Sequence, residues 1–176
     1  DKKLERINQE RKAAGEAAIN EFSKKLDITI FKPSVIFGRG DSFLNMFAGL
    51  VKLLPIIFLA KPEAKFQPIW VEDVAQCFVN ALENTATYGK SYELGGPQIY
   101  TLKQLVEKVM QILGKQRPII GLNDTLSMLQ AFMLELMPIK LMTRDNIRSM
   151  QVDSITAQSI APELNVVPTA LEVVVP

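Results

Sequence analysis

The feature that most constrains the fold is a regular alternation of short apolar segments with amphipathic ones. Residues 27–38, DITIFKPSVIFG, are β-branched and apolar almost throughout, which is typical of a strand covered on both faces. Lys32 and Pro33 interrupt this segment, so its second half should lie at a sheet end or beside a cleft. Further strands are predicted at 66–70, 91–96 and 117–122. The alternation of strands and helices predicts an α/β fold, although the sheet connections cannot be fixed from the sequence.

Apolar residues at steps of three and four predict the helices between these strands. One helix covers residues 2–26, and another covers 71–84, with Glu72 and Asp73 in its first turn, where acidic groups complement the helix dipole. A third covers 102–113, and two capping-box pairs are predicted, Thr101 with Gln104 and, near the end of the chain, Thr169 with Glu172. Gly114 should close the third helix. Two more helices are predicted at 124–137 and, after Thr143 as cap, through Met150.

The apolar stretch 43–60 has two interpretations. It holds 18 residues with one charge, Lys52, and a proline at 55. A membrane-spanning helix needs about 20 apolar residues, and a central lysine and proline disfavour one. We therefore expect a helix to Leu54 followed by a short strand, with a membrane span as the alternative.

The composition excludes several classes of function. The 176 residues contain no histidine, which excludes Ser-His-Asp and Cys-His catalysis and histidine-ligated metal sites. Lysine and arginine total 20 against 19 acidic residues, so no long-range field favours nucleic acid. The single cysteine, Cys77, is expected to pack within a helix and fits a reducing compartment. The chain starts without methionine and without a signal-peptide pattern, and we expect it to be part of a longer protein.

Four ordered segments resemble a known family: a helix ending in GEAAI, then TIFKPSVIFGRGD, FQPIWVEDVAQCFVNAL and YELGGPQIYTLKQLV. Together they resemble the C-terminal half of an extended, atypical short-chain dehydrogenase of the NAD-dependent epimerase/dehydratase superfamily. The most similar members are the accessory subunit of respiratory complex I with this fold and its bacterial relatives. The resemblance implies a partial Rossmann-type fold, in which residues 1–40 supply the last helix and strand of a Rossmann-like domain. Residues 41–176 would form the smaller, mixed α/β substrate lobe.

The resemblance also implies a site. In this superfamily the helix before KPSVIFG carries YxxxK, whose tyrosine acts as general acid or base and whose lysine binds the cofactor ribose. Here Lys12 occupies the lysine position and Asn8 the tyrosine position, and an amide cannot donate a catalytic proton. The loop of Pro33, Ser34 and Val35 would pass beside the nicotinamide. We therefore assign Lys12 and these three residues to cofactor binding, and no residue to catalysis or to a metal.

Alternative interpretations of these residues stay open. Lys12 can be an ordinary solvated helix lysine, and Pro33 an edge-strand proline without a ligand nearby. Trp70, the single tryptophan, can line a substrate cleft together with Asn8 or simply pack in the core. If another residue supplies the proton, Glu10, Glu16, Asp41 or a water held by Asn8 would have to do so, and no feature singles one out.

Two functional hypotheses follow, and whether the protein is an enzyme stays open between them. The first is an NAD(P)-binding protein whose catalysis has lapsed, with a structural or redox-sensing role related to NADH:quinone oxidoreductase. The second is an active oxidoreductase, epimerase or reductase on a nucleotide-sugar, isoprenoid or quinone-like substrate. The glycine-rich dinucleotide fingerprint does not occur in this sequence, so NAD or NADP is expected to bind tightly only through the longer protein.

The partners expected under the first hypothesis are a dinucleotide and a quinone or lipid-like small molecule, and no nucleic acid. The protein is expected in the cytoplasm or peripherally at the inner membrane, in association with complex I. Because unpaired strand edges invite self-association, a homodimer of this part of the protein is also expected.

Overall fold

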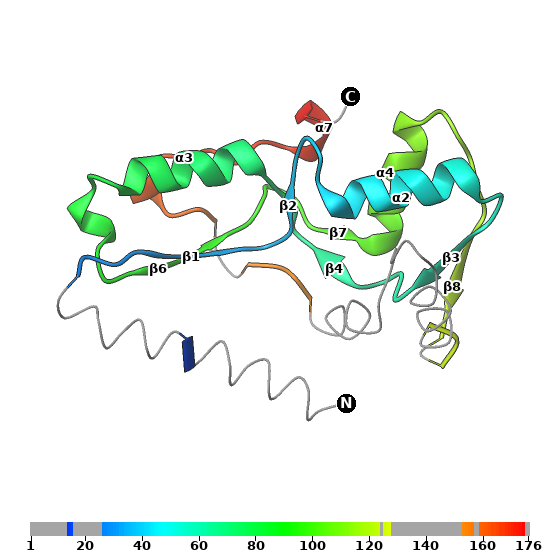
Figure 1. The fold of residues 1–176 in the computed structure, drawn as a ribbon, viewed down its shortest axis with the longest axis horizontal. Coiled ribbons are helices and arrows are strands. Elements are labelled where there is room, and N and C mark those ends of the chain that lie inside the picture. Colours follow the sequence, from blue (N-terminus) through cyan, green and yellow to red (C-terminus); the bar gives the residue numbers. More distant parts are fainter. Residues whose placement is uncertain (1–13, 16–25, 124, 128–152, 157–158, 175–176) are drawn as a thin grey trace.

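The structure, a computed structural model, describes residues 14–15, 26–123, 125–127, 153–156 and 159–174 (Figure 1). Most of the helix predicted at 2–26, all of the one predicted at 143–150 and most of the one predicted at 124–137 lie outside the described residues. Residues 125–127 are helical. The fold is mixed α/β, as the alternation of segments predicts.

The predicted strand 27–38 is two strands. β1 (Ile30–Pro33) pairs in parallel with β6 (Ser91–Leu94), and β2 (Ile36–Phe37) pairs in parallel with β5 (Ile69–Trp70). The break falls just after Pro33, which confirms that the proline interrupts the segment. The expectation of burial on both faces is wrong, since the β1 residues are half-buried or exposed. Among the described residues a helix, α3 (Val71–Ala81), covers one face of the β1–β6 pair (Figure 1).

Two further strand pairs lie on the other side of β2. β3 (Ile57–Ala60) pairs in parallel with β8 (Ile119–Leu122), which confirms strands predicted after Leu54 and within 117–122. β4 (Lys65–Phe66) pairs antiparallel with β7 (Tyr100–Thr101). The predicted strand 66–70 is therefore divided between β4 and β5, because Pro68 lacks the N–H that a continuous ladder would use.

The helices begin and end close to the positions that their patterns predict. α2 (Ser42–Leu53) is capped by Asp41, whose carboxylate accepts a hydrogen bond from the N–H of Leu44 at 2.7 Å. α3 (Val71–Ala81) carries acidic residues in its first turn, and α4 (Leu102–Ile112) opens with the predicted capping box. Gly114 has a φ of 61°, the left-handed conformation that suits glycine after a helix. Among the described residues, no helix is long and apolar enough to cross a membrane.

Buried side chains form two clusters. The first core cluster lies between α2, α4 and the strands β3, β4 and β7, and its largest fully buried members are Phe37, Phe47, Ile57, Leu59, Leu102 and Leu105. The second core cluster lies between α3, β6 and the C-terminal segment, residues 159–174, and includes Ile69, Val74, Cys77, Leu94, Ile160 and Leu164. Two residues before position 40 contribute to the clusters. Phe37 belongs to the first core cluster, and Phe31 packs against the second. The domain division at residue 40 stays a prediction.

The C-terminal segment is fastened to both clusters. It contains η2 (Pro162–Leu164) and α7 (Leu171–Val174), and it also passes over the first turn of α3. There the buried carboxylate of Asp73 accepts hydrogen bonds from the N–H and the hydroxyl of Thr169, at 2.6 and 3.1 Å. The predicted capping box of Thr169 and Glu172 is therefore wrong, since Thr169 binds Asp73 and the Glu172 carboxylate binds Tyr100 and Lys108.

Candidate functional site

The first candidate site lies where β1 and β6 end side by side. Pro33 and Leu94 are paired at the end of the ladder, and the N–H of Ser34 donates to the carbonyl of Leu94 at 2.8 Å. The chain then changes partner, because the carbonyl of Val35 accepts from the N–H of Ile69 at 2.9 Å. Ligands of open α/β sheets bind at the carboxyl ends of the strands. The predicted cofactor segment 33–35 thus stands at the edge where such sites occur.

Polar groups from four separate segments of the chain meet next to the carboxyl ends of β1 and β6. The strand-end cluster consists of Ser34, Gln67, Gly96, Ser154 and Thr156. The Ser34 hydroxyl donates to the carbonyl of Ser154 at 2.7 Å, and the side-chain amide of Gln67 donates to the carbonyl of Gly96 at 2.7 Å. The amide oxygen of Gln67 accepts from the N–H of Thr156 at 2.8 Å. Through these two hydrogen bonds Gln67, which lies just before β5, joins the loop after β6 to the segment that contains Thr156.

The two glycines after β6 let these loops approach closely. A Cβ atom on Gly96 would lie 1.8 Å from the carbonyl oxygen of Pro68, which is backbone and cannot move aside. A Cβ atom on Gly95 would lie 2.6 Å from the Thr156 hydroxyl. Both positions therefore require glycine for packing. The sequence pattern shows this pair, but its spacing does not match a phosphate-binding turn.

The chemistry available in the strand-end cluster is limited to hydroxyl, amide and backbone groups. Such groups can orient a neutral hydrogen-bonding ligand, such as a carboxamide, but they cannot transfer a proton near neutral pH. No group of residues that could hold a metal ion occurs in the described part of the chain.

The predicted site residues are only partly described. Pro33 is exposed, Ser34 is half-buried, and Val35 is half-buried against the first core cluster. Asn8 and Lys12 lie outside the described residues, so their position relative to segment 33–35 stays a prediction. Trp70 is half-buried, packs against the first core cluster and also lines a cleft. Its predicted place in a substrate cleft with Asn8 stays a prediction, because Asn8 lies outside the described residues.

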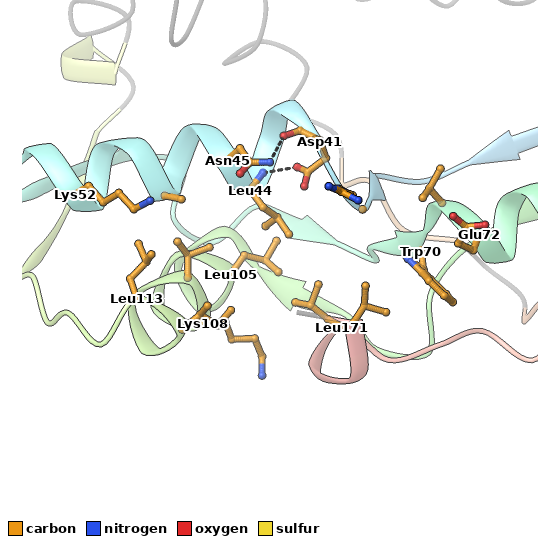
Figure 2. A pocket seen from close by; sticks show the side chains of 18 residues that line it. Asp41, Leu44, Asn45, Lys52, Trp70, Glu72, Leu105, Lys108, Leu113 and Leu171 are labelled. Atoms are coloured by element: carbon orange, nitrogen blue, oxygen red, sulfur yellow. Dashed lines mark hydrogen bonds between the residues drawn. The ribbon is translucent and has the colours of Figure 1, made fainter. Parts of the chain in front are cut away.

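The second candidate site, which we call the helix cleft, is a cavity of about 650 Å³ on the outer side of the first core cluster. Its walls are one face of α2 and one face of α4, and α7, the loop 38–41 and residues 70–72 close it (Figure 2). The loop 38–41 is a tight turn in which the N–H of Asp41 donates to the carbonyl of Gly38 and Gly40 has a φ of 83°. The cavity is within the size range of small-molecule sites.

Charge is unevenly distributed around the helix cleft. Lys52 lies at one end, whereas Trp70, Glu72 and Asp41 lie at the other (Figure 2), where Arg39 of the loop 38–41 also lines the cleft. Lys108 also lines the cleft, but its ammonium forms an ion pair with Glu172. None of the ion pairs of the described residues includes Lys52. The side chains between the two ends are mainly apolar, which makes the cleft suitable for an elongated amphipathic ligand.

The single cysteine has no place in either site. Cys77 is fully buried in α3, as predicted, and burial, with a smaller contribution from the charge of Asp73, raises the pKa of its thiol to about 11. A thiol with so high a pKa holds almost no thiolate at neutral pH and is a poor nucleophile. Cys77 is a packing residue.

Sequence reasoning did not find Gln67, Ser154 or Thr156. Their hydrogen bonds join residues that are 29 to 120 positions apart along the chain, and no local pattern encodes such contacts. In the sequence, Gln67 precedes a proline and a short strand, and this position is the signal that could have identified it. In the structure it lies opposite the glycine pair.

Comparison with known proteins agrees with the family resemblance. No family model matches the chain. It is 29% identical over 166 residues to the mitochondrial NADH dehydrogenase (ubiquinone) 1 alpha subcomplex subunit 9 of Arabidopsis thaliana, covering 90% of this chain and 40% of that protein. It is 37% identical over 100 residues to the Rattus norvegicus protein of the same name, covering 56% of this chain and 26% of that protein. The chain thus spans less than half the length of these relatives.

A solved structure shows the same fold. The dTDP-glucose 4,6-dehydratase of Bacillus anthracis, in complex with NAD, superposes with a TM-score of 0.55 at 18% identity, covering 63% of this chain and 37% of that one. The homologues of this chain are therefore complex I subunits, and its structural neighbours have the extended short-chain dehydrogenase fold. Both findings confirm the resemblance inferred from the four sequence segments.

Proposed function

We propose that this chain is the C-terminal part of an NAD(P)-binding, short-chain dehydrogenase-like protein related to complex I, in which dehydrogenase chemistry has lapsed. The observation that carries the proposal is its similarity, across 90% of the chain, to NADH dehydrogenase (ubiquinone) 1 alpha subcomplex subunit 9. The protein would then serve a structural or redox-sensing role in an assembly related to NADH:quinone oxidoreductase.

The cofactor role rests on the position of segment 33–35. Ser34 and Val35 are fixed by backbone hydrogen bonds to Leu94 and Ile69, so this wall is rigid before any ligand arrives. NAD or NADP, when bound, supplies a hydride donor or acceptor, and these residues would orient the nicotinamide. Lys12 would bind the ribose from the preceding helix. The pyrophosphate site would come from the longer protein, because its glycine-rich turn does not occur in this sequence.

The proposed loss of catalysis rests on Asn8. The position expected to hold a phenolic proton donor carries an amide, whose N–H groups do not ionise in the range that proton transfer requires. The strand-end cluster, which carries no ionisable side chain, offers no substitute. A bound dinucleotide would therefore stabilise the fold or report redox state through occupancy rather than through turnover.

The proposed setting is a peripheral position at the inner membrane, in association with complex I. The support is the identity of the relatives, which are named as subunits of mitochondrial NADH dehydrogenase (ubiquinone). A quinone or lipid-like molecule is the second proposed partner, and self-association of this chain through unpaired strand edges is a third proposal.

Hydride transfer by the full-length protein tests the proposal. The unmodified protein and Asn8→Phe should show no turnover of NADH or NADPH with short-chain quinones or nucleotide sugars. Asn8→Tyr should gain measurable turnover, because only this variant restores a hydroxyl four residues before Lys12. Asn8→Phe is the matched control, since it adds the same ring without the hydroxyl. Robust turnover in the unmodified protein would favour the alternative, an active oxidoreductase or epimerase.

Calorimetric titration separates cofactor binding from catalysis. NADH and NADPH should bind the full-length protein, and Lys12→Ala should weaken that binding, whereas Lys24→Ala, in the same predicted helix, should not. The 176-residue chain alone should bind either dinucleotide weakly. If neither dinucleotide binds the full-length protein, the cofactor proposal fails whatever the activity.

A further inference from the structure

We propose that the helix cleft binds a single-chain anionic amphiphile, with its headgroup at Lys52 and its hydrocarbon chain between α2 and α4. This ligand differs from the dinucleotide, and the helix cleft contains none of residues 33–35 and no member of the strand-end cluster. The proposal therefore does not depend on NAD(P) binding.

The shape of the cleft selects a linear ligand. One stripe of α2 lines it from Asp41 to Lys52, and at 1.5 Å per helical residue this stripe is about 16 Å long. Leu44 and Ala48 lie along the stripe, facing Leu105 and Val109 of α4 across the cavity. An extended hydrocarbon chain would fit against both walls, and its transfer from water is favourable because it removes apolar surface on both sides.

The charged residues at the two ends of the cleft determine which charge the ligand should carry and in which direction it should lie. Lys52 is the cation at one end, whereas at the other end two carboxylates, Asp41 and Glu72, outnumber one cation, Arg39, so the net charge there repels an anion (Figure 2). The ion pair with Glu172 holds Lys108 away from this role. An anionic headgroup therefore has one favourable position, beside Lys52, with the tail directed toward Trp70.

Trp70 gives a direct measurement of occupancy. It is the single tryptophan of the chain and lines the far end of the cleft, so its fluorescence should shift when a hydrocarbon chain displaces water beside it. The probes are octanoate, decanoate and laurate, each kept below its micelle concentration, with lauryl alcohol as the neutral analogue. The titrations use the 176-residue chain and the full-length protein in parallel, with other tryptophans of the longer protein replaced.

Chain length and charge give separate expected results. Affinity should rise by up to about fourfold for each methylene that enters the cleft, and level off once the chain exceeds its length. Lys52→Glu should weaken laurate about fivefold and leave lauryl alcohol unchanged. Lys65→Glu, an exposed lysine of β4 outside the cleft, is the matched control and should change neither ligand.

A steric variant tests the location. Ala48→Phe should fill the cleft and abolish the laurate response, whereas Ala75→Phe, on the exposed side of α3, should leave it intact. The proposal is overturned if laurate leaves Trp70 fluorescence unchanged up to its solubility limit. It is equally overturned if affinity is independent of chain length, or if Lys52→Glu and Lys65→Glu behave alike. A vesicle of anionic lipid that alters Trp70 when laurate does not would assign the face to a membrane surface instead.

Discussion

The C-terminal segment closes both core clusters with the same three residue types, but the two closures differ in burial. At the second core cluster, the Tyr92 hydroxyl and the Lys90 ammonium both donate to Glu163, at 3.0 and 3.1 Å. At the first core cluster, the Tyr100 hydroxyl donates to Glu172 at 3.0 Å, and Lys108 pairs with the same carboxylate. Each closure is thus a tyrosine, a glutamate and a lysine.

The lysine is more withdrawn from water at the first core cluster, where its side chain is 28% exposed against 52% at the second, but the glutamate is more exposed there, at 46% against 30%. Burial, and then the hydrogen bond to Glu172, raises the pKa of Tyr100 to about 12, whereas the pKa of Tyr92 is raised by burial to a lesser degree. The Lys108 ammonium also lies 5.3 Å from the centre of the Tyr100 ring. The tyrosines are buried in both closures, and the difference that favours the first closure lies in the lysine, which is partly buried beside the helix cleft and half exposed at the second core cluster.

The largest expected effects come from the cores themselves. Phe47→Ala in the first cluster should lower the free energy of unfolding by about 3–5 kcal/mol, and Leu164→Ala in the second by about 2–5 kcal/mol. Leu53→Ala and Val167→Ala, at positions 77% and 89% exposed, are matched controls and should change it by less than about 0.5 kcal/mol. Urea unfolding checks this. Because one segment closes both clusters, each core variant should shift a single transition, and a biphasic curve would show that the clusters unfold independently.

Removing the two hydroxyl groups should separate the closures. Tyr100→Phe should lower the free energy of unfolding by about 1–2 kcal/mol, and Tyr92→Phe by less, because the pKa of Tyr92 is raised less than that of Tyr100. The folded pKa of Tyr100, about 12, exceeds its ordinary value of 10, so its contribution is complete below pH 10 and is lost between pH 10 and about 12. Chemical unfolding across this range should show the loss in the unmodified protein and not in Tyr100→Phe. Equal losses in both proteins would contradict the assignment.

The smallest effect distinguishes the two glutamates. The pKa values of Glu163 and Glu172 are both below 4.5, so the stability they contribute is present above that pH and is lost as the pH falls. The main cause at Glu172 is the hydrogen bond from Lys108, whereas the main cause at Glu163 is a hydrogen bond from its own backbone. Lys108→Met should therefore raise the pKa of Glu172 more than Lys90→Met raises that of Glu163. NMR titration of the carboxyl carbons measures both, and equal rises would refute the difference.

Local patterns were enough to predict most of the described helices and strands. The capping pair Thr101 and Gln104, the acidic first turn of α3 and the apolar period of α2 depend on neighbours within one or two turns, and the structure confirms them. The antiparallel pair β4–β7 was not predicted. Its two short strands are far apart in the sequence, and two-residue strands carry no period.

The sites were less predictable because competing long-range contacts decide them. Thr169 and Glu172 have the same spacing as Thr101 and Gln104, yet only the latter pair forms a capping box. Buried Asp73 and the Tyr100 hydroxyl offer Thr169 and Glu172 stronger partners than a short helix end does. The family resemblance placed segment 33–35 at the carboxyl end of a parallel strand, but neither it nor periodicity indicated the strand-end cluster or the helix cleft.

The fastening of the C-terminal segment has a mechanical consequence. Glu163, Thr169 and Glu172 lie on one short run of backbone, so a displacement of α3 is transmitted through that run to α4. Proteolytic cleavage at exposed Val167 would leave Glu163 before the cut and Glu172 after it. Each glutamate would keep its own partners, but the backbone link between the two closures would be broken. The two core clusters would stay joined through the β2–β5 pair, to which Phe37 of the first cluster and Ile69 of the second both belong, so such a cut should loosen the C-terminal segment without separating the clusters.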